Sequence, residues 1–300
     1  MARKGRFART TQSTEAKLQK SRQMSAVAPN VSVVVRNRNE EHHLENVLAA
    51  LRRQSLPVEI IVVDNESTDG SQVVAKNHGA RIVNISRQEF TYGKALNDGM
   101  RAATGEIVIN MSAHALPLGS RFIEQLVSEF SDPLAGGVRC EDIGYIDQHF
   151  NWMKRHELQW PVTWDDVWQH GLVNTCCAIR RSAWERIPYD ESLDAAEDSL
   201  WTYQALQAGY TIRSSDCYYW YTRRRSLLQW IEAVNRTMAG QYRIAHNCSQ
   251  KIVLHDVLSY LFFRGPKLYL RSSIELVGRY CSVRFARRRS TFETERGSLR

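Results

Sequence analysis

Runs of apolar residues alternate with helical patterns along the chain from about residue 30 onward. Residues 31–35 read VSVVV, a continuous β-branched run that predicts a strand buried on both faces. A second run of this kind, at residues 58–64, leads into the turn NESTDG. Between the two runs, apolar residues recur at the spacing of one helix face: Leu44, Val47, Leu48 and Leu51. This part of the chain therefore predicts a strand, a helix and a second strand.

The same alternation continues to about residue 112. Helical patterns cover residues 71–78 and 95–103, and strands are predicted at residues 80–85 and 106–111. Strands that alternate with helices in this way indicate βαβ units and a parallel sheet. The pattern therefore predicts an α/β fold class.

The two ends of the chain differ from this middle part. Residues 1–28 are polar and rich in Ser, Thr, Lys and Arg, which is typical of a flexible basic arm. Residues 253–285 place apolar side chains at helical spacing among basic ones, and Gly265-Pro266 breaks them into two helical pieces. The chain is therefore predicted to contain an arm (1–28), an α/β domain (29–225) and a helical, basic C-terminal extension (226–300).

Charge is concentrated at these ends. The 300 residues carry 40 Lys and Arg against 32 Asp and Glu, a formal net charge of +8. The first 30 and the last 50 residues hold the basic excess, which leaves an acidic middle. A protein that binds nucleic acid normally carries its positive charge on the folded body, so we exclude nucleic acid as a partner. The basic, amphipathic C-terminal extension instead predicts contact with an anionic membrane surface, or packing on the body or on a second subunit of a homo-oligomer.

Cysteine usage and the apolar segments favour a location inside the cell. The six cysteines form no CxxC pair, which is typical of structural thiols in a reducing compartment. No apolar stretch follows the basic N-terminal residues, so we expect no signal peptide. The most apolar late stretch, residues 252–263, is too short for a bilayer, which takes about 20 residues. The expected location is the cytoplasm, with peripheral attachment to the cytoplasmic face of the inner membrane as the alternative.

Polar residues follow three of the predicted strands. The turns are Arg36-Asn37-Arg38-Asn39, Asp64-Asn65-Glu66 and Ser112-Ala113-His114. Ligands of such sheets bind beyond the carboxyl ends of the strands, so the three turns together predict a binding site. No GxGxxG, GxxxxGK[ST], HExxH or GxSxG motif occurs, which argues against a dinucleotide site, a P-loop and the common hydrolase classes.

Four segments carry a resemblance to a known family. They read VSVVVRNRNEEHHLENVLAALRRQSLPVEIIVVDNESTDGS, YGKALNDGMRAATGEIVINMSAHALP, CCAIRRSAW and AAEDSLWTYQALQAGY. In this order and spacing they resemble inverting family-2 glycosyltransferases with the GT-A fold, and the SAH-A-x-P variant resembles a bacterial rhamnosyltransferase-like subgroup. The resemblance covers nearly two-thirds of the chain. It implies a Rossmann-like, mixed and mostly parallel sheet flanked by helices, and transfer of a sugar from a nucleoside-diphosphate sugar to a hydroxyl acceptor on a glycan or lipid-linked glycan.

The resemblance also implies residues that bind the donor. The turn from Arg36 to Asn39 and the pair Asp64-Asn65 match segments that hold the base and ribose. Lys94 and Asn97 match the segment that closes over the donor, where a cation meets diphosphate charge. The alternative for Asp64 is a purely structural turn, in which its side chain accepts hydrogen bonds from the backbone that follows.

Glu197-Asp198 resembles the family's acidic pair. In that reading Asp198 deprotonates the acceptor hydroxyl and Glu197 orients it, since an alcohol is a poor nucleophile without a positioned base. Two acids at the start of a helix also meet the helix dipole favourably, which is the structural alternative. Both interpretations are compatible, because a helix N-terminus is a rigid place for a base.

The sequence departs from the family where most members carry Asp-x-Asp, whose carboxylates bind Mg²⁺ or Mn²⁺. Here the residues are Ser112-Ala113-His114, so His114 is the candidate metal ligand and Ser112 a candidate hydrogen-bond partner of ribose or phosphate. Imidazole suits Mn²⁺ better than Mg²⁺. Arg223, Arg224 and Arg225 are an alternative source of positive charge for the diphosphate, or a solvated basic turn. The sequence therefore does not decide whether a divalent cation, Mn²⁺ or Mg²⁺, is used. The alternative to an enzyme is an inactive GT-A-like binding module.

Aromatic residues are dense between residues 151 and 171. This segment is predicted to form part of an acceptor wall, because aromatic rings stack on sugar faces. The alternative is core packing. The residues concerned are Trp152, His156, Trp160, Trp164, Trp168 and His170.

Overall fold

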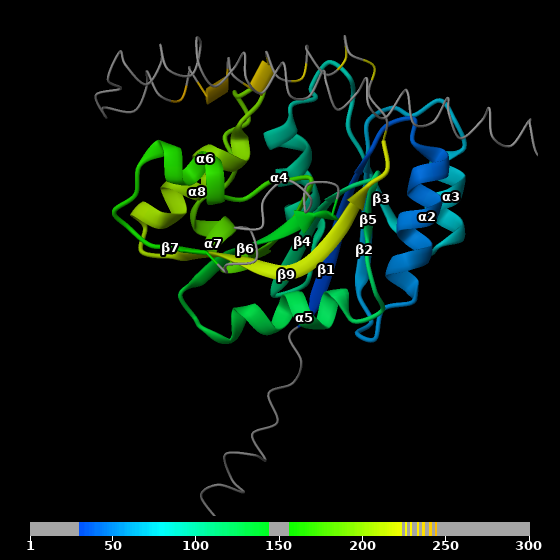
Figure 1. Cartoon of the computed structure of the whole chain (residues 1–300). Helices are drawn as coiled ribbons and strands as arrows, with labels where there is room; N and C mark the ends of the chain where they lie inside the picture. The colour runs from blue at the N-terminus through cyan, green and yellow to red at the C-terminus, as the bar shows by residue number, and fades with distance from the viewer. Residues whose placement is uncertain are drawn as a thin grey trace, which may run out of the picture. The chain divides into compact units, whose positions relative to one another are not determined.

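The computed structural model describes residues 30–143 and 156–223, and, beyond them, residues 226, 229, 233, 236, 237, 240, 241 and 244. The chain divides after Arg223 into two compact units. All the helices and strands given below belong to the first unit (Figure 1). The predicted arm and most of the predicted C-terminal extension lie outside the described residues, so their structure stays a prediction.

The first half of the α/β unit follows the order predicted from the apolar pattern. Strands and helices alternate strictly up to the fourth strand, as the βαβ prediction requires. The elements are β1 (Val31–Asn37), α2 (Glu41–Arg52), β2 (Glu59–Asp64), α3 (Ser71–Asn77), β3 (Arg81–Asn84), α4 (Tyr92–Ala102) and β4 (Ile107–Ser112).

The second half is less regular. It contains two long strands among shorter strands and helices, and these elements follow no simple alternation. The elements are β5 (Ala115–Pro117), α5 (Phe122–Ser128), the 3₁₀ turn η1 (Glu129–Ser131), β6 (Ala135–Asp142), β7 (Glu157–Leu158), α6 (Trp164–His170), β8 (Cys176–Arg180), α7 (Arg181–Arg186), α8 (Glu197–Gln207) and β9 (Thr211–Tyr221).

One mixed sheet joins these strands. Its order is β3-β2-β1-β4-β8-β6-β9-β5, with β7 paired to β9. The four strands from β3 to β4 run parallel to one another, whereas β8 is antiparallel to both of its neighbours. The predicted mixed, mostly parallel sheet flanked by helices is therefore confirmed.

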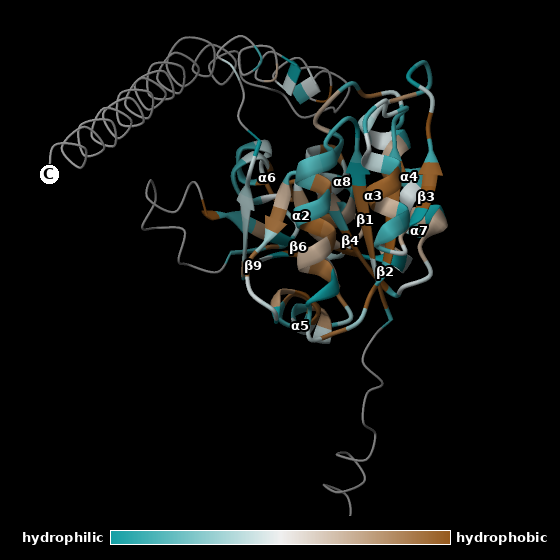
Figure 2. Ribbon diagram, turned by 90° about the vertical axis from the view of Figure 1, so that its right-hand side faces the viewer, coloured by the Kyte–Doolittle hydropathy of each residue, from teal (hydrophilic) through white to brown (hydrophobic). Residues whose placement is uncertain are grey.

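Alternate residues of the central strands pack on opposite sides of the sheet. On one side, Val33 and Val35 belong to a cluster that contains the buried face of α2, namely Leu44, Val47, Leu48 and Leu51. On the other side Val34 meets α4, where a Cβ added to Gly99 would lie only 2.3 Å from the Val34 Cγ1. Glycine is required at position 99 because α4 lies so close to the sheet. Figure 2 shows the hydrophobic strands between helices whose outward parts are hydrophilic.

Helix α4 begins three residues earlier than the apolar pattern predicted. The Thr91 side chain accepts a hydrogen bond from the Lys94 backbone N–H at 3.1 Å, and this cap starts the helix at Tyr92. The prediction began at Ala95 because apolar periodicity detects the buried face and not the cap. Among the described residues, the helices are all too short or too polar to cross a bilayer.

Candidate functional site

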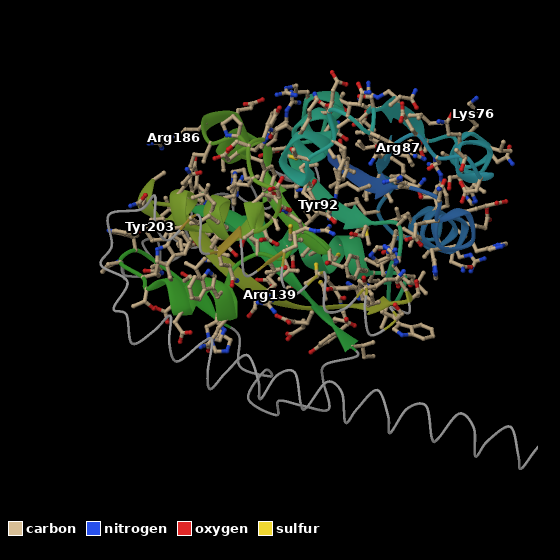
Figure 3. All side chains as sticks on the ribbon, turned by 90° about the horizontal axis from the view of Figure 1, so that it is seen from above. Lys76, Arg87, Tyr92, Arg139, Arg186 and Tyr203 are labelled. Atoms are coloured by element: carbon tan, nitrogen blue, oxygen red, sulfur yellow. The ribbon has the colours of Figure 1, made fainter. Side chains whose placement is uncertain are left out.

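The three predicted polar turns lie together at one edge of the sheet. Asn37 at the end of β1 pairs in register with Asp64 at the end of β2, and Arg36 pairs with Ser112 at the end of β4. Because β8 runs antiparallel beside β4, the loop that enters it reaches the same edge. The prediction that these strand ends converge is confirmed. In Figure 3 the unit is seen from above, with Tyr92 near the middle of the view.

Asp64 is fully buried, and both of its carboxylate oxygens accept hydrogen bonds from the protein. One accepts from the Ser67 N–H at 3.0 Å and the Gln72 amide at 2.9 Å, and the other accepts from the Asn37 amide at 2.9 Å. Burial alone would raise the pKa of Asp64, but the hydrogen bonds outweigh it and hold the pKa below the ordinary value. Asp64 is therefore an anion that organises the turn after β2, as in the structural alternative. The predicted contact of Asp64 with the sugar-nucleotide donor stays a prediction.

The turns around Asp64 contain amide oxygens that have no hydrogen-bond partner in the described part of the chain. They are the Oδ1 atoms of Asn37 and Asn65, both of which are buried. Asn39 lies beside them with φ +51°, a left-handed conformation that Asn tolerates, and its Oδ1 accepts from the Thr68 N–H at 2.7 Å. A buried acceptor without a partner costs free energy, so the two orphaned oxygens are suited to receive an N–H from a ligand.

Arg36 extends from β1 across the end of β4. One terminal nitrogen of its guanidinium donates to the Ser112 Oγ at 3.2 Å and to the Asn174 backbone oxygen at 2.6 Å. The guanidinium also lies over the Tyr92 ring, 5.5 Å from its centroid. Two predicted residues, Arg36 and Ser112, are thus brought together with a third, Asn174, that the sequence did not single out.

Glu197 and Asp198 form the first turn of α8, beside this group. The residue before them, Ala196, has φ +65°, which makes the chain turn sharply into the helix. Glu197 is buried and accepts from the Asn174 side-chain amide at 3.1 Å. Asp198 is only partly buried, and it accepts from the Asn174 backbone N–H at 3.2 Å and the Ser199 N–H at 2.8 Å. The acidic pair therefore lies at the same edge of the sheet as Arg36, with the second carboxylate more accessible than the first.

Burial raises the pKa of both carboxyls. For Glu197, burial and the neighbouring Asp198 charge raise the pKa to about 7, against the opposing charge of Arg36 and the Asn174 hydrogen bond. For Asp198, burial raises the pKa, while the N–H groups of Asn174 and Ser199 and the charge of Arg36 oppose the rise. Two adjacent carboxyls whose ionisation is made costly in this way suit proton transfer near neutral pH.

The raised pKa of Glu197 predicts a pH-dependent effect of Glu197→Gln on stability. Between pH 4.5 and about 7, an unfolded Glu197 has lost the proton that the folded protein retains, so the free energy of unfolding falls as the pH rises through this window. Gln cannot ionise. The change in the free energy of unfolding caused by the substitution should therefore be more stabilising at pH 8 than at pH 4, by on the order of 1–3 kcal/mol. Urea titrations at both pH values measure this, and equal effects at pH 4 and pH 8 would contradict it.

His114 lies in a second cluster, centred on Glu40 in the turn before α2. The Glu40 Oε1 is 3.5 Å from the His114 Nδ1 and 3.3 Å from an Arg223 terminal nitrogen, and the other oxygen is 3.7 Å from the His43 Nε2. Burial would raise the pKa of Glu40, but these three neighbours lower it below its ordinary value. Burial lowers the pKa of His114 despite the facing carboxylate, so the imidazole is neutral near pH 7. Arg225 lies outside the described residues.

Two residues of α4, Lys94 and Asn97, were predicted to contact the sugar-nucleotide donor, and in the structure both bind other residues of the protein. The Lys94 ammonium pairs with Asp98, one helical turn along, at 3.0 Å. The Asn97 amide donates to the Tyr189 backbone oxygen and to Glu191, and its oxygen accepts from the Trp184 indole and the Tyr189 N–H. Asn97 therefore tethers α4 to the segment that follows α7. The donor contacts of both residues stay predictions.

The predicted acceptor wall is partly a packed aromatic cluster. Trp164 is buried and stacks on Tyr203 of α8 at 4.3 Å between ring centroids, which supports the core-packing alternative for this residue. Trp160 also contacts Tyr203, but 43% of it is exposed. His156 and His170 stack on each other at 4.0 Å. Trp152 lies outside the described residues.

Glu40 and Asn174 are the residues that sequence reasoning missed. Glu40 directly follows the polar turn Arg36–Asn39, and this position was the available signal. Asn174 follows no predicted strand, and no local pattern marks it. Only the antiparallel insertion of β8 brings it to the edge where Arg36 lies. The part of the chain that the structure describes contains no group of three His, Cys, Asp or Glu side chains that could hold a metal ion.

Comparison with known proteins relates the chain to glycosyltransferases. The O-antigen chain rhamnosyltransferase RfbN of Salmonella typhimurium is 25% identical over 199 residues, which cover 61% of this chain and 62% of that protein. The O-antigen chain rhamnosyltransferase WbaN of Salmonella anatum is 24% identical over 176 residues, which cover 54% of this chain and 55% of that protein. The chain thus spans only about three-fifths of the length of these relatives.

Among solved structures, the mannosyltransferase PcManGT from Pyrobaculum calidifontis, in complex with GDP-Man and Mn²⁺, superposes with a TM-score of 0.62 at 23% identity. The superposition covers 83% of this chain and 74% of that one, and it confirms the predicted GT-A fold. The family model described as "Glycosyl transferase family 2" matches residues 32–188. Since this match covers just over half of the sequence, the chain belongs to glycosyl transferase family 2.

Proposed function

We propose that the protein transfers a hexosyl group from a nucleoside-diphosphate sugar to a hydroxyl acceptor on a glycan or lipid-linked glycan, with inversion at the anomeric carbon. One observation carries this proposal. The partly accessible Asp198 and the buried Glu197 start α8 at the carboxyl edge of the sheet, where Asn174 joins them to the Arg36 guanidinium. The orphaned acceptors of Asn37 and Asn65 lie at the same edge, at the ends of β1 and β2. An acidic pair, a guanidinium and unpartnered hydrogen-bond acceptors at one edge fit a sugar nucleotide, which carries both a nucleobase and a diphosphate.

Asp198 is the group that takes the acceptor proton. The acceptor oxygen attacks the anomeric carbon, the bond from that carbon to the diphosphate oxygen breaks, and the nucleoside diphosphate departs with the electron pair. A single displacement of this kind inverts the anomeric centre. The raised pKa of Asp198 makes it a stronger base than an ordinary carboxylate, and its incomplete burial lets an acceptor reach it.

The turns that follow β1, β2 and β4 are assigned to binding of the sugar-nucleotide donor. The Oδ1 atoms of Asn37 and Asn65 are suited to accept the imide N–H of a uracil or thymine base, or a ribose hydroxyl. Arg36, Ser112 and Arg223, with Arg225 beyond the described residues, are assigned to the diphosphate. RfbN and WbaN are named as O-antigen chain rhamnosyltransferases, which supports a deoxyhexose donor and a polysaccharide acceptor for this chain.

A divalent cation is part of the proposal, and His114 with Glu40 would hold it. The His114 Nδ1 is buried without a hydrogen bond and faces the anionic Glu40 carboxylate at 3.5 Å. One nitrogen ligand and one oxygen ligand would suit Mn²⁺ better than Mg²⁺. PcManGT was solved with Mn²⁺. When bound, the cation would neutralise charge that develops on the leaving diphosphate.

His114→Ala is expected to weaken the response of activity to the cation. Removing the nitrogen ligand should shift the Mn²⁺ titration of initial rates to concentrations at least about tenfold higher, because even loss of a group that hydrogen-bonds to a metal ligand typically lowers metal affinity 10–100-fold. His78→Ala, which removes an imidazole that pairs with Glu45 and not with Glu40, is the control. If the Mn²⁺ titration of His114→Ala coincides with that of the unaltered protein, the mechanism works without a cation at His114.

The proposed activity is tested with a panel of sugar nucleotides. The full chain is incubated with UDP-, GDP- and dTDP-linked hexoses and deoxyhexoses, with and without Mn²⁺, and released nucleoside diphosphate is measured. Release from at least one donor is expected, and it should increase when a glycan acceptor is added. No release from any donor under either condition would favour the rival reading, a GT-A-like binding module.

Attachment to an anionic membrane is proposed for the C-terminal extension. The proposal rests on the basic and apolar residues of 253–289, which lie outside the described residues, and on the basic excess at the end of the chain. Co-sedimentation of the full chain with anionic vesicles at low salt decides it. Protein that stays in the supernatant would contradict membrane attachment and favour packing on the body or on a second subunit.

A further inference from the structure

Asn174 lies at the centre of the hydrogen bonds around the acidic pair. It is 2% exposed and stands in the loop that enters β8. Its side-chain amide donates to the Glu197 Oε1, its backbone N–H donates to the Asp198 Oδ2, and its backbone oxygen accepts from Arg36. A single residue thus contacts both carboxylates and the cation beside them.

The orientation of the Asn174 amide is fixed from the opposite side. Its Oδ1 accepts from the Tyr189 hydroxyl at 2.8 Å and from the Cys177 thiol at 3.4 Å. The Tyr189 hydroxyl in turn accepts from the Asn110 amide at 3.3 Å, in the middle of β4. Because the hydroxyl hydrogen is directed at Oδ1, the NH₂ group of Asn174 must face Glu197. A chain of buried polar contacts therefore runs from the sheet to the acidic pair.

We propose that Asn174 is the positioning residue of the Glu197–Asp198 pair: its two N–H groups hold the carboxylates in separate directions, and its carbonyl oxygen holds Arg36 beside them. This inference rests on the proposed function, since it assigns a role for Asn174 in presenting the base to the acceptor. Asn174 itself is not a catalytic residue, because it acts through Asp198.

The physical need for such a residue comes from the pair itself. Two adjacent carboxylates at a buried helix start repel each other, and each needs donors to remain in a fixed rotamer. Asp198 has one further donor in the Ser199 N–H, whereas Glu197 accepts its side-chain hydrogen bond from the Asn174 amide. The charged and titratable groups that face the pair from the neighbouring elements are Arg36, Cys177 and Tyr189. Without the amide, Glu197 can turn toward Asp198 or Arg36 and displace the base.

The first test is the kinetics of Asn174→Ala in the full chain. The kcat is expected to fall by about 10²-fold with the KM for the donor changed less than about threefold, because a base displaced by an ångström loses the reaction geometry and not the donor contacts. In an Asp198→Asn background the same substitution should reduce the residual turnover less than about threefold, since the group through which Asn174 acts is already gone.

Thr202→Val is the matched control. Thr202 is fully buried on α8 and accepts from the Leu172 N–H at 3.0 Å, so it joins the same loop to the same helix without touching either carboxylate. It should lower the melting temperature as Asn174→Ala does, yet leave kcat within about threefold of the unaltered protein. Equal kcat losses in Asn174→Ala and Thr202→Val would make Asn174 a merely structural residue and overturn the proposal.

A second measurement does not depend on activity. Carboxyl ¹³C titration by NMR follows Glu197 and Asp198 directly, and Asn174→Ala should raise the titration midpoint of Glu197 because a donor to its ionised form is lost. Thr202→Val should leave it in place. An unchanged Glu197 midpoint in folded Asn174→Ala protein overturns the positioning role. If the unaltered protein turns over no donor while the midpoint shifts as expected, the proposed function fails and the hydrogen-bonding role of Asn174 stands.

Discussion

Asp198→Asn is expected to abolish sugar transfer while leaving the fold and the donor affinity intact. The substitution keeps the size of the side chain and one acceptor oxygen, so one of the two hydrogen bonds from the Asn174 and Ser199 N–H groups can persist. It removes the basicity, and loss of a general base costs on the order of 10²–10⁴ in rate. Single-turnover transfer measures the chemical step, and calorimetric titration with the donor measures its dissociation constant.

Glu185→Gln on α7 is the control for Asp198→Asn. The Glu185 side chain is 53% exposed and pairs with Arg181, so its loss alters the charge of the protein by the same amount away from the sheet edge. The kcat of Glu185→Gln should match that of the unaltered protein. More than about a tenth of the original kcat in Asp198→Asn would show that another group takes the acceptor proton.

The second large effect is on stability. Trp201 of α8 is 1% exposed and its indole N–H donates to the Ile187 backbone oxygen at 2.6 Å. Trp201→Ala should lower the free energy of unfolding by about 3–5 kcal/mol, because it removes the ring from a packed core and leaves a cavity. Urea unfolding followed by far-UV circular dichroism gives the value.

Trp201→Phe separates packing from hydrogen bonding at this position. Phe keeps most of the ring that packs near Tyr189, whose centroid is 6.0 Å away, and loses the bond to the Ile187 oxygen. A loss less than half that of Trp201→Ala is expected, since a hydrogen bond contributes about 0.5–1.5 kcal/mol net. If Trp201→Ala costs less than about 1 kcal/mol, α8 is not anchored through this ring.

The sequence predicted the helices and strands that are determined by residues close together along the chain. The β-branched runs at 31–35 and 58–64 lie in buried strands, and the apolar face of residues 44–51 lies in α2, because periodicity reports local burial directly. The start of α4 was placed too late, since Thr91 acts through a hydrogen bond that apolar spacing does not report. The irregular second half could not be predicted in this way, because no alternation identifies the short β5 and β7.

The candidate site divides in the same manner. The proximity of Arg36 and Ser112 could be predicted from the sequence, since parallel strands in a βαβ order place their carboxyl ends at one edge of the sheet. The acidic pair needed the family resemblance, because two acids at a helix start are equally suited to capping. Asn174 and Glu40 could not be assigned, since their roles depend on contacts with residues far away in the sequence.

The antiparallel β8 also has a consequence for how the protein acquires its activity during synthesis. Arg36 and Asn174 are 138 positions apart, and the acids follow a further 23 and 24 positions along the chain. Contacts of such long sequence separation form late, because the intervening loop must be closed first. A nascent chain released before α8 would contain the parallel strands and the turns that follow them, but neither Glu197 nor Asp198. On the proposed assignment such a product lacks the base, so transfer would begin only after α8 has folded.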